Sequence, residues 1–177
     1  MVRRGHTRFD EPVKLASGEL SRDFIDGKRA FSKGADLQFA CAEILREVGG
    51  IEFDAVGGLT MGADPLAHVI AVLADCEWFV VRKEPKGRGT NKLVEGCAVA
   101  RGTRVLLVDD VVTTGGSIQK ALAAIEAEDA AVVAAATLVD RGETAAQFFA
   151  ARGIPYTALV TYKDLGIEPV GRDLATA

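Results

Sequence analysis

Two adjacent acids and a short loop of hydroxyls and glycines follow an apolar run near the middle of the chain. Asp109 and Asp110 come directly after residues 105–108, and residues 113–117 read Thr-Thr-Gly-Gly-Ser. Glycines let backbone amides approach an anion closely, and hydroxyls add further hydrogen-bond donors. A helix that opens at Ser117 would add its free amides and the positive end of its dipole. The segment therefore predicts a phosphate-binding loop.

The acid pair points to a sugar beside that phosphate. Two carboxylates would repel a phosphate unless a neutral, hydroxylated group such as ribose lay between them. Asp109 and Asp110 suit the 2- and 3-hydroxyls, each charge-assisted hydrogen bond contributing about 1.5–3 kcal/mol. They would also favour positive charge developing on the sugar ring. The structural alternative is that Asp110 caps a turn and the glycines only make a tight connection, which explains less of the combined pattern.

A compact cationic segment provides a second candidate site. Residues 82–92 contain five basic residues and one acidic residue, a local charge of +4 in a chain of net charge −4. This distribution argues against general nucleic-acid binding and favours a small, highly anionic ligand. A solvated surface loop is the alternative reading of such a cluster.

Length and composition suit one α/β domain. The chain has 177 residues, of which 49% are hydrophobic and 6% aromatic. Neither a membrane span nor a signal peptide is expected, because no apolar run approaches 18 residues. The three cysteines, Cys41, Cys76 and Cys97, are scattered without metal-ligand spacing, which predicts free thiols in a reducing cytoplasm.

The elements that would position these residues alternate along the chain. Residues 104–108 are the clearest strand, and residues 105–108 form a continuous apolar run of the kind that is buried on both faces of a parallel sheet. Alternating strands and helices predict a mostly parallel sheet, with ligands beyond the carboxyl ends of the strands. Strands are expected at 53–56, 78–81, 104–108, 131–139 and 156–161, and helices at 34–48, from Pro65, from Ser117 and at 143–151.

Residues 105–117 closely resemble the diphosphate-sugar signature of the type I phosphoribosyltransferases. Residues 81–96 resemble the flexible catalytic loop of the orotate phosphoribosyltransferases. The resemblance implies catalytic roles for Lys83, Lys86, Arg88, Asp109 and Asp110. It assigns to 5-phosphoribosyl 1-diphosphate the residues Thr60, Met61, Gly62, Arg82, Lys83, Lys86, Arg88, Asp109, Asp110, Val111, Val112, Thr113, Thr114, Gly115, Gly116 and Ser117.

Two further segments resemble the base-binding parts of that family. Residues 13–26 are similar to its N-terminal segment, which implies that Phe24 stacks on the base, although a core role for Phe24 is equally open. Residues 138–143 are similar to the segment in which an arginine pairs with the orotate carboxylate. The resemblance thus gives Arg141, with Thr113, to the base. An ion pair of Arg141 with Asp140 or Glu143 is the alternative.

The chain departs from the family at several of these positions. Arg88 stands where the family usually has histidine, which keeps a charge but removes a proton donor near neutral pH. Ala16 stands where many relatives have lysine, and Met61 stands where some relatives have lysine. Residues 57–67 otherwise match the family's loop on the diphosphate side, where backbone amides of residues 60–62 would bind diphosphate. A glycine loop that serves packing alone is the competing interpretation.

The resemblance implies a type I phosphoribosyltransferase fold in a single domain, residues 1–177. Residues 1–33 would form a small base-binding hood, and residues 34–177 a core with a flexible loop at about 84–103. The expected reaction is Mg²⁺-dependent transfer of ribose 5-phosphate to orotate by a cytoplasmic homodimer whose loop acts in trans. Mg²⁺ would be held chiefly by diphosphate and sugar oxygens and by waters, with few dedicated protein ligands, and no metal-ligating residue is assigned. Another base, such as a purine, and a non-catalytic sensor of phosphoribosyl diphosphate are the two rivals.

Overall fold

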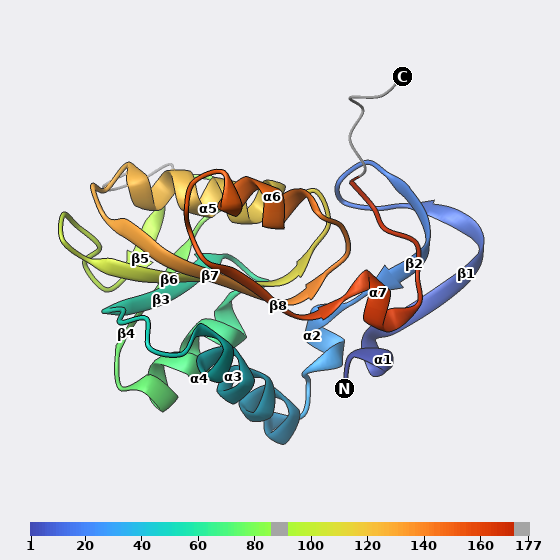
Figure 1. Ribbon diagram of the computed structural model, residues 1–177, viewed down its shortest axis with the longest axis horizontal. Coiled ribbons are helices and arrows are strands. Elements are labelled where there is room, and N and C mark those ends of the chain that lie inside the picture. The colour runs from blue at the N-terminus through green and yellow to red at the C-terminus, as the bar shows by residue number, and fades with distance from the viewer. Residues whose placement is uncertain (86–91, 172–177) are drawn as a thin grey trace.

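The computed structural model describes residues 1–85 and 92–171. A six-stranded sheet lies between two layers of helices, and a small two-stranded sheet projects from one end of it (Figure 1). No helix within the described ranges is long and apolar enough to cross a membrane. The architecture is the mixed α/β fold with a mostly parallel sheet that the alternating pattern predicts.

The central sheet has the strand order β5-β4-β3-β6-β7-β8. All neighbouring pairs are parallel except β4 and β5, which run antiparallel at one edge. The acid-bearing strand β6 is therefore central and has parallel neighbours on both sides. The strands are β3 (Ala55–Leu59), β4 (Glu77–Val81), β5 (Val94–Gly96), β6 (Arg104–Val112), β7 (Ala131–Asp140) and β8 (Tyr156–Thr161).

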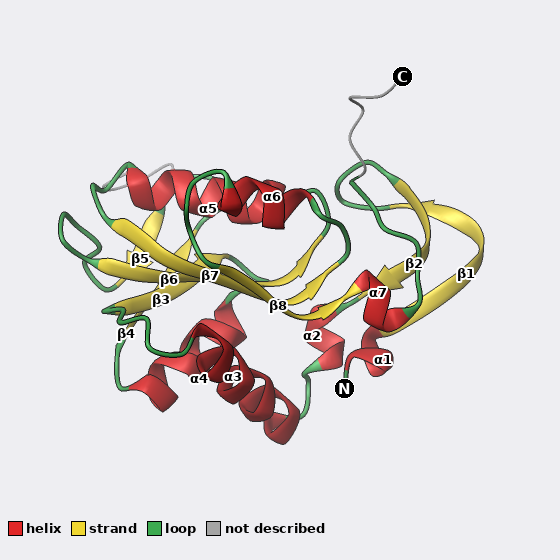
Figure 2. Cartoon of the chain, viewed as in Figure 1, coloured by secondary structure: helices red, strands yellow, loops and turns green. Residues whose placement is uncertain are grey.

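Helices cover both faces of this sheet (Figure 2). The helices α3 (Gly34–Val48) and α4 (Asp64–Ala74) pack on one face, and α5 (Gly116–Glu126) and α6 (Thr144–Ala150) lie on the other. Pro65 stands in the first turn of α4, where its fixed φ suits a helix start. A short helix, α7 (Tyr162–Leu165), follows β8 and begins with a capping box between Thr161 and Asp164.

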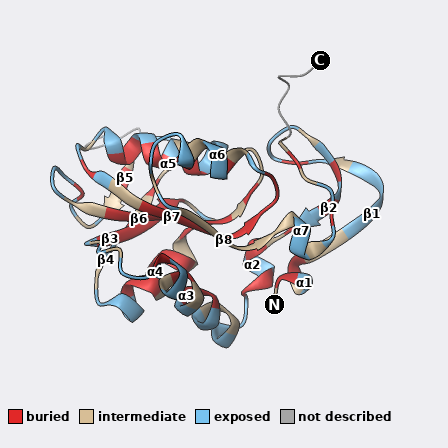
Figure 3. Cartoon of the chain, viewed as in Figure 1, coloured by how far each residue is buried: buried red, intermediate tan, exposed pale blue. Residues whose placement is uncertain are grey.

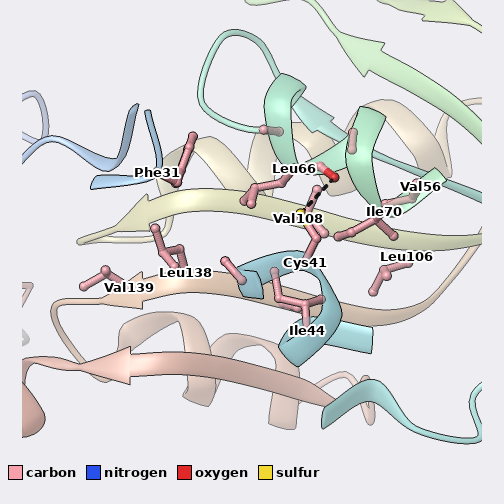
Figure 4. Packing of buried hydrophobic residues seen from close by; sticks show 14 of the residues in the cluster. Phe31, Cys41, Ile44, Val56, Leu66, Ile70, Leu106, Val108, Leu138 and Val139 are labelled. Carbon is pink, nitrogen blue, oxygen red and sulfur yellow. Dashed lines mark hydrogen bonds between the residues drawn. The ribbon is translucent and has the colours of Figure 1, made fainter. Parts of the chain in front are cut away.

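Two buried clusters fill the spaces above and below the sheet. On β6, Leu106 and Val108 contribute to the cluster beneath α3 and α4, where Ile44 also lies (Figure 4). The intervening Val105 and Leu107 contribute to the cluster beneath α5. Side chains of a strand alternate between the faces of a sheet, so a strand covered on both faces is apolar throughout. The burial of β6 and β7 in Figure 3 confirms this interpretation for residues 105–108.

Two strands extend further than their sequence patterns indicate. Strand β3 continues through Gly57 and Gly58 to Leu59, because glycine permits close approach of the neighbouring strands. A Cβ at Gly58 would lie 2.0 Å from the carbonyl oxygen of Val108. Strand β6 continues to Val112, so the acid pair belongs to the end of the strand rather than to the loop after it.

Residues 1–33 form a separate small layer, which we call the hood. It consists of α1 (Val2–Gly5), the antiparallel strands β1 (His6–Lys14) and β2 (Leu20–Ile25), and α2 (Gly27–Ala30). The sequence pattern did not reveal β1 because most of its residues are exposed and polar, which weakens the period-2 signal. Ile25 and Phe31 of the hood lie in the same buried cluster as Leu138 and Val139, so the hood packs on the core.

The segment at 84–103 is only partly loop. Residues 94–96 form β5, which pairs with β4. Residues 86–91 lie outside the described ranges, and with them Lys86 and Arg88.

Candidate active site

A cavity of about 720 Å³ opens between the carboxyl ends of β3, β6 and β7 and the hood. It combines segments that are far apart in the sequence, which is the usual place for a ligand in a mostly parallel sheet. Its walls are Leu15–Ser17, Phe24–Lys28, Leu59–Gly62, Lys83, Glu84, Asp109–Ser117, Lys120 and Arg141.

The acid pair forms the floor of this cavity. Asp109 and Asp110 are 4% and 8% exposed. One oxygen of each is satisfied locally, because Asp109 Oδ1 accepts from the Asp110 amide at 3.0 Å and Asp110 Oδ1 from the Val111 amide at 2.8 Å. Asp109 Oδ2 is buried and has no hydrogen-bond partner within the described chain. Burial, and then the neighbouring Asp110, raise the pKa of Asp109 to about 8.

Two glycines, one in the hood and one in the loop after β3, pack closely against the Asp110 side chain. A Cβ at Gly27 in the hood would lie 2.7 Å from Asp110 Oδ2, and a Cβ at Gly62 would lie 2.5 Å from Asp110 Oδ1. Real Cβ atoms essentially never approach this closely, so a side chain at either position would force Asp110 or its surroundings to move. The hood and the loop after β3 therefore both contact the acid pair directly.

The predicted phosphate loop lies at the turn from β6 into α5. Gly115 is the N-cap of α5 with φ of 79°, a conformation that favours glycine. The first amides of α5 have no partner within the helix, and Thr113, Thr114 and Ser117 stand beside them in the cavity wall. Thr113–Ser117 thus offers the backbone and hydroxyl donors that an anion needs.

The loop after β3 offers fewer donors than the sequence indicates. The Thr60 amide donates to the Val81 carbonyl oxygen at 2.8 Å, and its hydroxyl donates to Asp64 Oδ2 at 2.8 Å. Within the described part of the chain, the amides of Met61 and Gly62 have no such partner. The Thr60–Met61 peptide bond is cis. The amide of Thr60 is therefore committed to the sheet, and residues 61–62 face the cavity with free donors.

The cationic residues divide into two groups. Lys83 lines the cavity. Arg82 is not among the lining residues, and its guanidinium donates to the Glu84 carbonyl oxygen and to Glu95 Oε1, both at 3.3 Å.

On the hood side, Phe24 is 42% exposed and faces the cavity, so it is not a core residue. Arg141 is only 1% exposed. Its Nη1 donates to the Asp23 carbonyl oxygen at 2.6 Å and its Nη2 to Ser21 Oγ at 3.0 Å. Its Nε has no partner in the described chain. Burial lowers the pKa of this guanidinium.

The residues beside Arg141 are occupied elsewhere. Asp140 Oδ1 accepts from the Gly142 amide at 3.0 Å, and its Oδ2 accepts from the Tyr156 hydroxyl at 2.8 Å. The Tyr156 oxygen also lies 3.0 Å from Thr137 Oγ1. This buried network fixes the turn that carries Arg141, whose own hydrogen bonds reach β2.

Three residues of the cavity wall lie outside the segments that the sequence indicated. Gly27 and Lys28 come from α2, and Lys120 follows the phosphate loop by one helical turn. Lys28 Nζ lies 3.3 Å from Asp110 Oδ2, across 82 positions of sequence. No local pattern marks such a contact, because only the docking of the hood creates it.

Comparisons with known proteins agree with this geometry. The phosphoribosyl transferase domain family matches residues 32–147. Orotate phosphoribosyltransferase of Corynebacterium glutamicum is 42% identical over 159 residues, covering 88% of this chain and 85% of that protein. The crystal structure of orotate phosphoribosyltransferase from Aeropyrum pernix superimposes with a TM-score of 0.78 at 32% identity, covering 93% of this chain and 94% of that one.

A third similar protein carries a ligand. Orotate phosphoribosyltransferase of Mycobacterium tuberculosis, solved in complex with 5-phospho-α-D-ribosyl 1-diphosphate, has a TM-score of 0.75 to this chain at 33% identity. The match covers 94% of both chains.

Proposed function

We propose, since the chain belongs to the orotate phosphoribosyltransferase family, that it transfers ribose 5-phosphate from 5-phosphoribosyl 1-diphosphate to orotate. The products are orotidine 5-phosphate and diphosphate. The observation that carries this proposal is the single cavity in which a phosphate loop, a buried acid pair and an aromatic hood residue meet. These groups match three of the four parts of the two substrates: the 5-phosphate, the ribose and the base.

The 5-phosphate binds at Thr113–Ser117. Its oxygens accept from the free amides at the start of α5 and from the hydroxyls of Thr113, Thr114 and Ser117. The 11-residue helix adds the positive end of its dipole. This anchor fixes one end of the sugar, so that the reacting carbon at the other end is held in one place.

The ribose lies over Asp109 and Asp110, which accept from its hydroxyls. Asp110 Oδ2 and Asp109 Oδ2 are the oxygens not used by local backbone amides. As the bond between ribose C1 and the diphosphate oxygen breaks, its electron pair leaves with diphosphate and positive charge develops on the sugar ring. The nearby acid pair, chiefly the Asp110 carboxylate, stabilises that charge. The orotate ring nitrogen then forms the new bond to C1, and its N–H proton passes to the departing diphosphate or to water.

The departing diphosphate is bound by cations and backbone donors on the other side of the cavity. Lys83 and the amides of Met61 and Gly62 face this space. The family resemblance adds Lys86 and Arg88, which lie outside the described residues, and gives Lys86 a part in stabilising the departing group. Arg82 supports the loop through Glu84 and Glu95 and reaches the diphosphate only by leaving them.

The base occupies the space beneath the hood. Phe24 offers an exposed ring for stacking, and Thr113 borders the base from the core. Arg141 contributes its free Nε to an oxygen of orotate, while its terminal nitrogens keep the hood in position.

Mg²⁺ fits this site as an ion carried largely by the substrate. Within residues 1–85 and 92–171, no group of three or more His, Cys, Asp or Glu side chains could hold a metal ion. Asp109 and Asp110 lie at the end of β6 in the cavity wall, and the orphaned Oδ2 of Asp109 suits a hydroxylated or hydrated ligand. When bound, Mg²⁺ neutralises the charge on the diphosphate, and the ion takes its other ligands from substrate oxygens and water.

The working form is a homodimer of a one-domain chain in the cytoplasm. The hood shares a buried cluster with the core, which supports treating residues 1–177 as one domain. All three cysteines are free, and burial raises the pKa of the Cys41 thiol to about 12, which suits a reducing compartment. The loop at residues 84–103 acts on the neighbouring subunit's site.

The test is the absorbance change on mixing the protein with Mg²⁺, 5-phosphoribosyl 1-diphosphate and one acceptor at a time. Orotate, uracil, adenine, guanine and xanthine serve as acceptors. Consumption of orotate alone, lost in Arg141→Ala, supports the proposal. Turnover of another base would keep the chemistry but overturn the acceptor. Binding of 5-phosphoribosyl 1-diphosphate without turnover of any base would favour a sensor.

Action in trans has its own test. Lys86→Ala and Asp110→Asn each disable the site, but a mixed dimer joins an intact loop to an intact acid pair. Mixing the two inactive variants should therefore restore up to about a quarter of the wild-type activity. A mixture that stays inactive, although subunit exchange is verified by mass spectrometry, would show that the loop acts within its own chain.

A further inference from the structure

Lys28 is a cation of the cavity wall that neither the sequence motifs nor the proposed reaction uses. It lies on α2 in the hood, with its side chain 54% exposed and its Nζ 3.3 Å from Asp110 Oδ2. At that length the ion pair is loose, and at that exposure it contributes little to stability. The ammonium is thus available to a stronger anionic partner inside the cavity.

The contacts of Asp110 show on which side of the acid pair Lys28 lies. A Cβ at Gly62, in the loop after β3, would meet Oδ1, whereas a Cβ at Gly27, in the hood, would meet Oδ2. Lys28 bonds to Oδ2. Its ammonium therefore lies on the hood side, with Phe24 and Ala16, and away from the loop that faces the diphosphate.

The other cation on this side is Arg141, and much of its binding capacity is committed. Both of its terminal nitrogens bond to β2, and its side chain is almost completely buried. The Asp23 carboxylate, which pairs with His6 at 2.8 Å, also acts electrostatically on Arg141. Arg141 is therefore a fixed donor through Nε, while Lys28 carries a mobile full charge.

We propose that Lys28 binds the carboxylate of the acceptor base and so selects a carboxylated pyrimidine over its uncharged analogue. The inference rests on the proposed function. In orotate the carboxylate is attached next to the ring nitrogen that bonds to ribose C1. It must therefore lie close to the sugar, and the sugar lies on Asp110. A ribose hydroxyl that takes over Asp110 Oδ2 leaves Lys28 free to turn to that carboxylate.

The arrangement explains why a cation should stand at Lys28 in this chain. An anion entering the cavity from the hood side meets Asp26, Asp109 and Asp110 in its walls. Without a counter-charge these carboxylates would repel an acidic base. Lys28 supplies that charge in the cavity wall, beside the buried Asp110.

The experiment compares the binding of orotidine 5-phosphate with that of uridine 5-phosphate, which lacks the carboxylate. Dissociation constants are measured by calorimetry for the wild type, Lys28→Met and Arg29→Met. Lys28→Met should raise the dissociation constant of orotidine 5-phosphate about tenfold or more. The dissociation constant of uridine 5-phosphate should stay within about twofold of the wild-type value. Arg29→Met removes a charge from the same short helix outside the cavity wall and should leave the ratio unchanged.

Steady-state kinetics separate the remaining outcomes. The KM for orotate should rise in Lys28→Met while the KM for 5-phosphoribosyl 1-diphosphate stays within about threefold. If only the KM for 5-phosphoribosyl 1-diphosphate rose, and the ratio of the two nucleotides' dissociation constants were unchanged, Lys28 would be assigned to the diphosphate. That result would overturn the inference. An equal loss of affinity for both nucleotides would mean that Lys28 has only a structural role, and would also overturn the inference. Failure of the wild type to use orotate at all would instead overturn the proposed function.

Discussion

Arg141 Nη1 lies 2.6 Å from the carbonyl oxygen of Asp23, so the residue after β7 holds the second strand of the hood from 118 positions away. The second bond of the guanidinium, to Ser21, makes this a two-point attachment. Because Phe24 and the acid-contacting Gly27 follow directly, the attachment also determines the shape of the cavity.

The first prediction concerns this attachment. Arg141→Lys keeps a positive charge but cannot form the two-pronged contact. We expect the free energy of unfolding to fall by about 1–3 kcal/mol, because buried acceptors lose their donors. Hydrogen exchange should show lower protection in β2 specifically. Arg101→Lys, at an exposed arginine outside the hood, is the control and should change neither quantity. Normal protection of β2 in Arg141→Lys would contradict the role.

The second prediction tests the contact of Gly27 with Asp110. In Gly27→Ala, the new methyl group would lie within 3 Å of three Asp110 atoms, so either the carboxylate or the hood must move. We expect the KM for 5-phosphoribosyl 1-diphosphate to rise about 30-fold or more. Gly34→Ala is the matched control, since a Cβ there meets nothing within 4 Å. Similar kinetics for the two variants would refute the close packing.

The third prediction addresses the catalytic loop. Lys86→Ala should reduce kcat by about 100-fold or more, because the charge on the departing diphosphate loses its partner. The dissociation constant of 5-phosphoribosyl 1-diphosphate, measured by calorimetry, should change less than about tenfold. Lys92→Ala removes an exposed cation of the same segment and serves as the control. If binding and turnover fell equally, Lys86 would be a binding residue without a special role in the transition state.

The fourth prediction is a dependence of stability on pH. Burial raises the pKa of Asp109 in the folded chain to about 8, from an ordinary value of 3.8. Between these values the native state holds a proton that the unfolded chain releases, so this carboxyl's contribution to stability is present below about pH 4 and lost as pH rises through about 8.

Asp109→Asn mimics the protonated form and should remove that loss. Its free energy of unfolding, relative to the wild type, should be higher at about pH 8.5 than at about pH 5, by about 1–3 kcal/mol. Urea denaturation at the two pH values measures the difference. Asp129→Asn, at an exposed aspartate with φ of 60° that asparagine tolerates, should show no such change. The same difference in both variants would exclude Asp109 as its source.

The fifth prediction concerns the buried network behind Arg141. Tyr156→Phe deletes the hydroxyl that donates to Asp140 and leaves that buried carboxylate with the Gly142 amide. The expected cost is about 1–3 kcal/mol of stability, with a fall in kcat/KM for orotate, because the turn that carries Arg141 loosens. Tyr162→Phe removes an exposed hydrogen bond to Glu143 and should cost less than about 0.5 kcal/mol. Equal effects in the two variants would rule out a special role for Tyr156.

The sequence by itself determined the architecture and the chemistry of the site's central segment. An apolar run such as Val105–Val108 favours a strand that helices cover on both faces. Its side chains are buried in the clusters on both sides of the sheet. The order of acids, hydroxyls and glycines after it is a local pattern, since strand, turn and helix start are set by neighbours in the chain. For the same reason Pro65 marked the start of its helix correctly, and the helix expected from Ser117 begins one residue earlier, at Gly116.

Tertiary structure decided everything that depends on contacts between distant segments. The sequence left open whether Phe24 lies in the core or in the cavity, and the packing of the hood on the core decides this. Arg141 bonds to β2 and not to its sequence neighbours. The commitment of the Thr60 amide to Val81, and the approach of Lys28 to Asp110, have no trace in local periodicity. The physical reason is that periodicity reports which face of an element is buried, whereas a pairing across 82 positions depends on how two separately formed layers pack together.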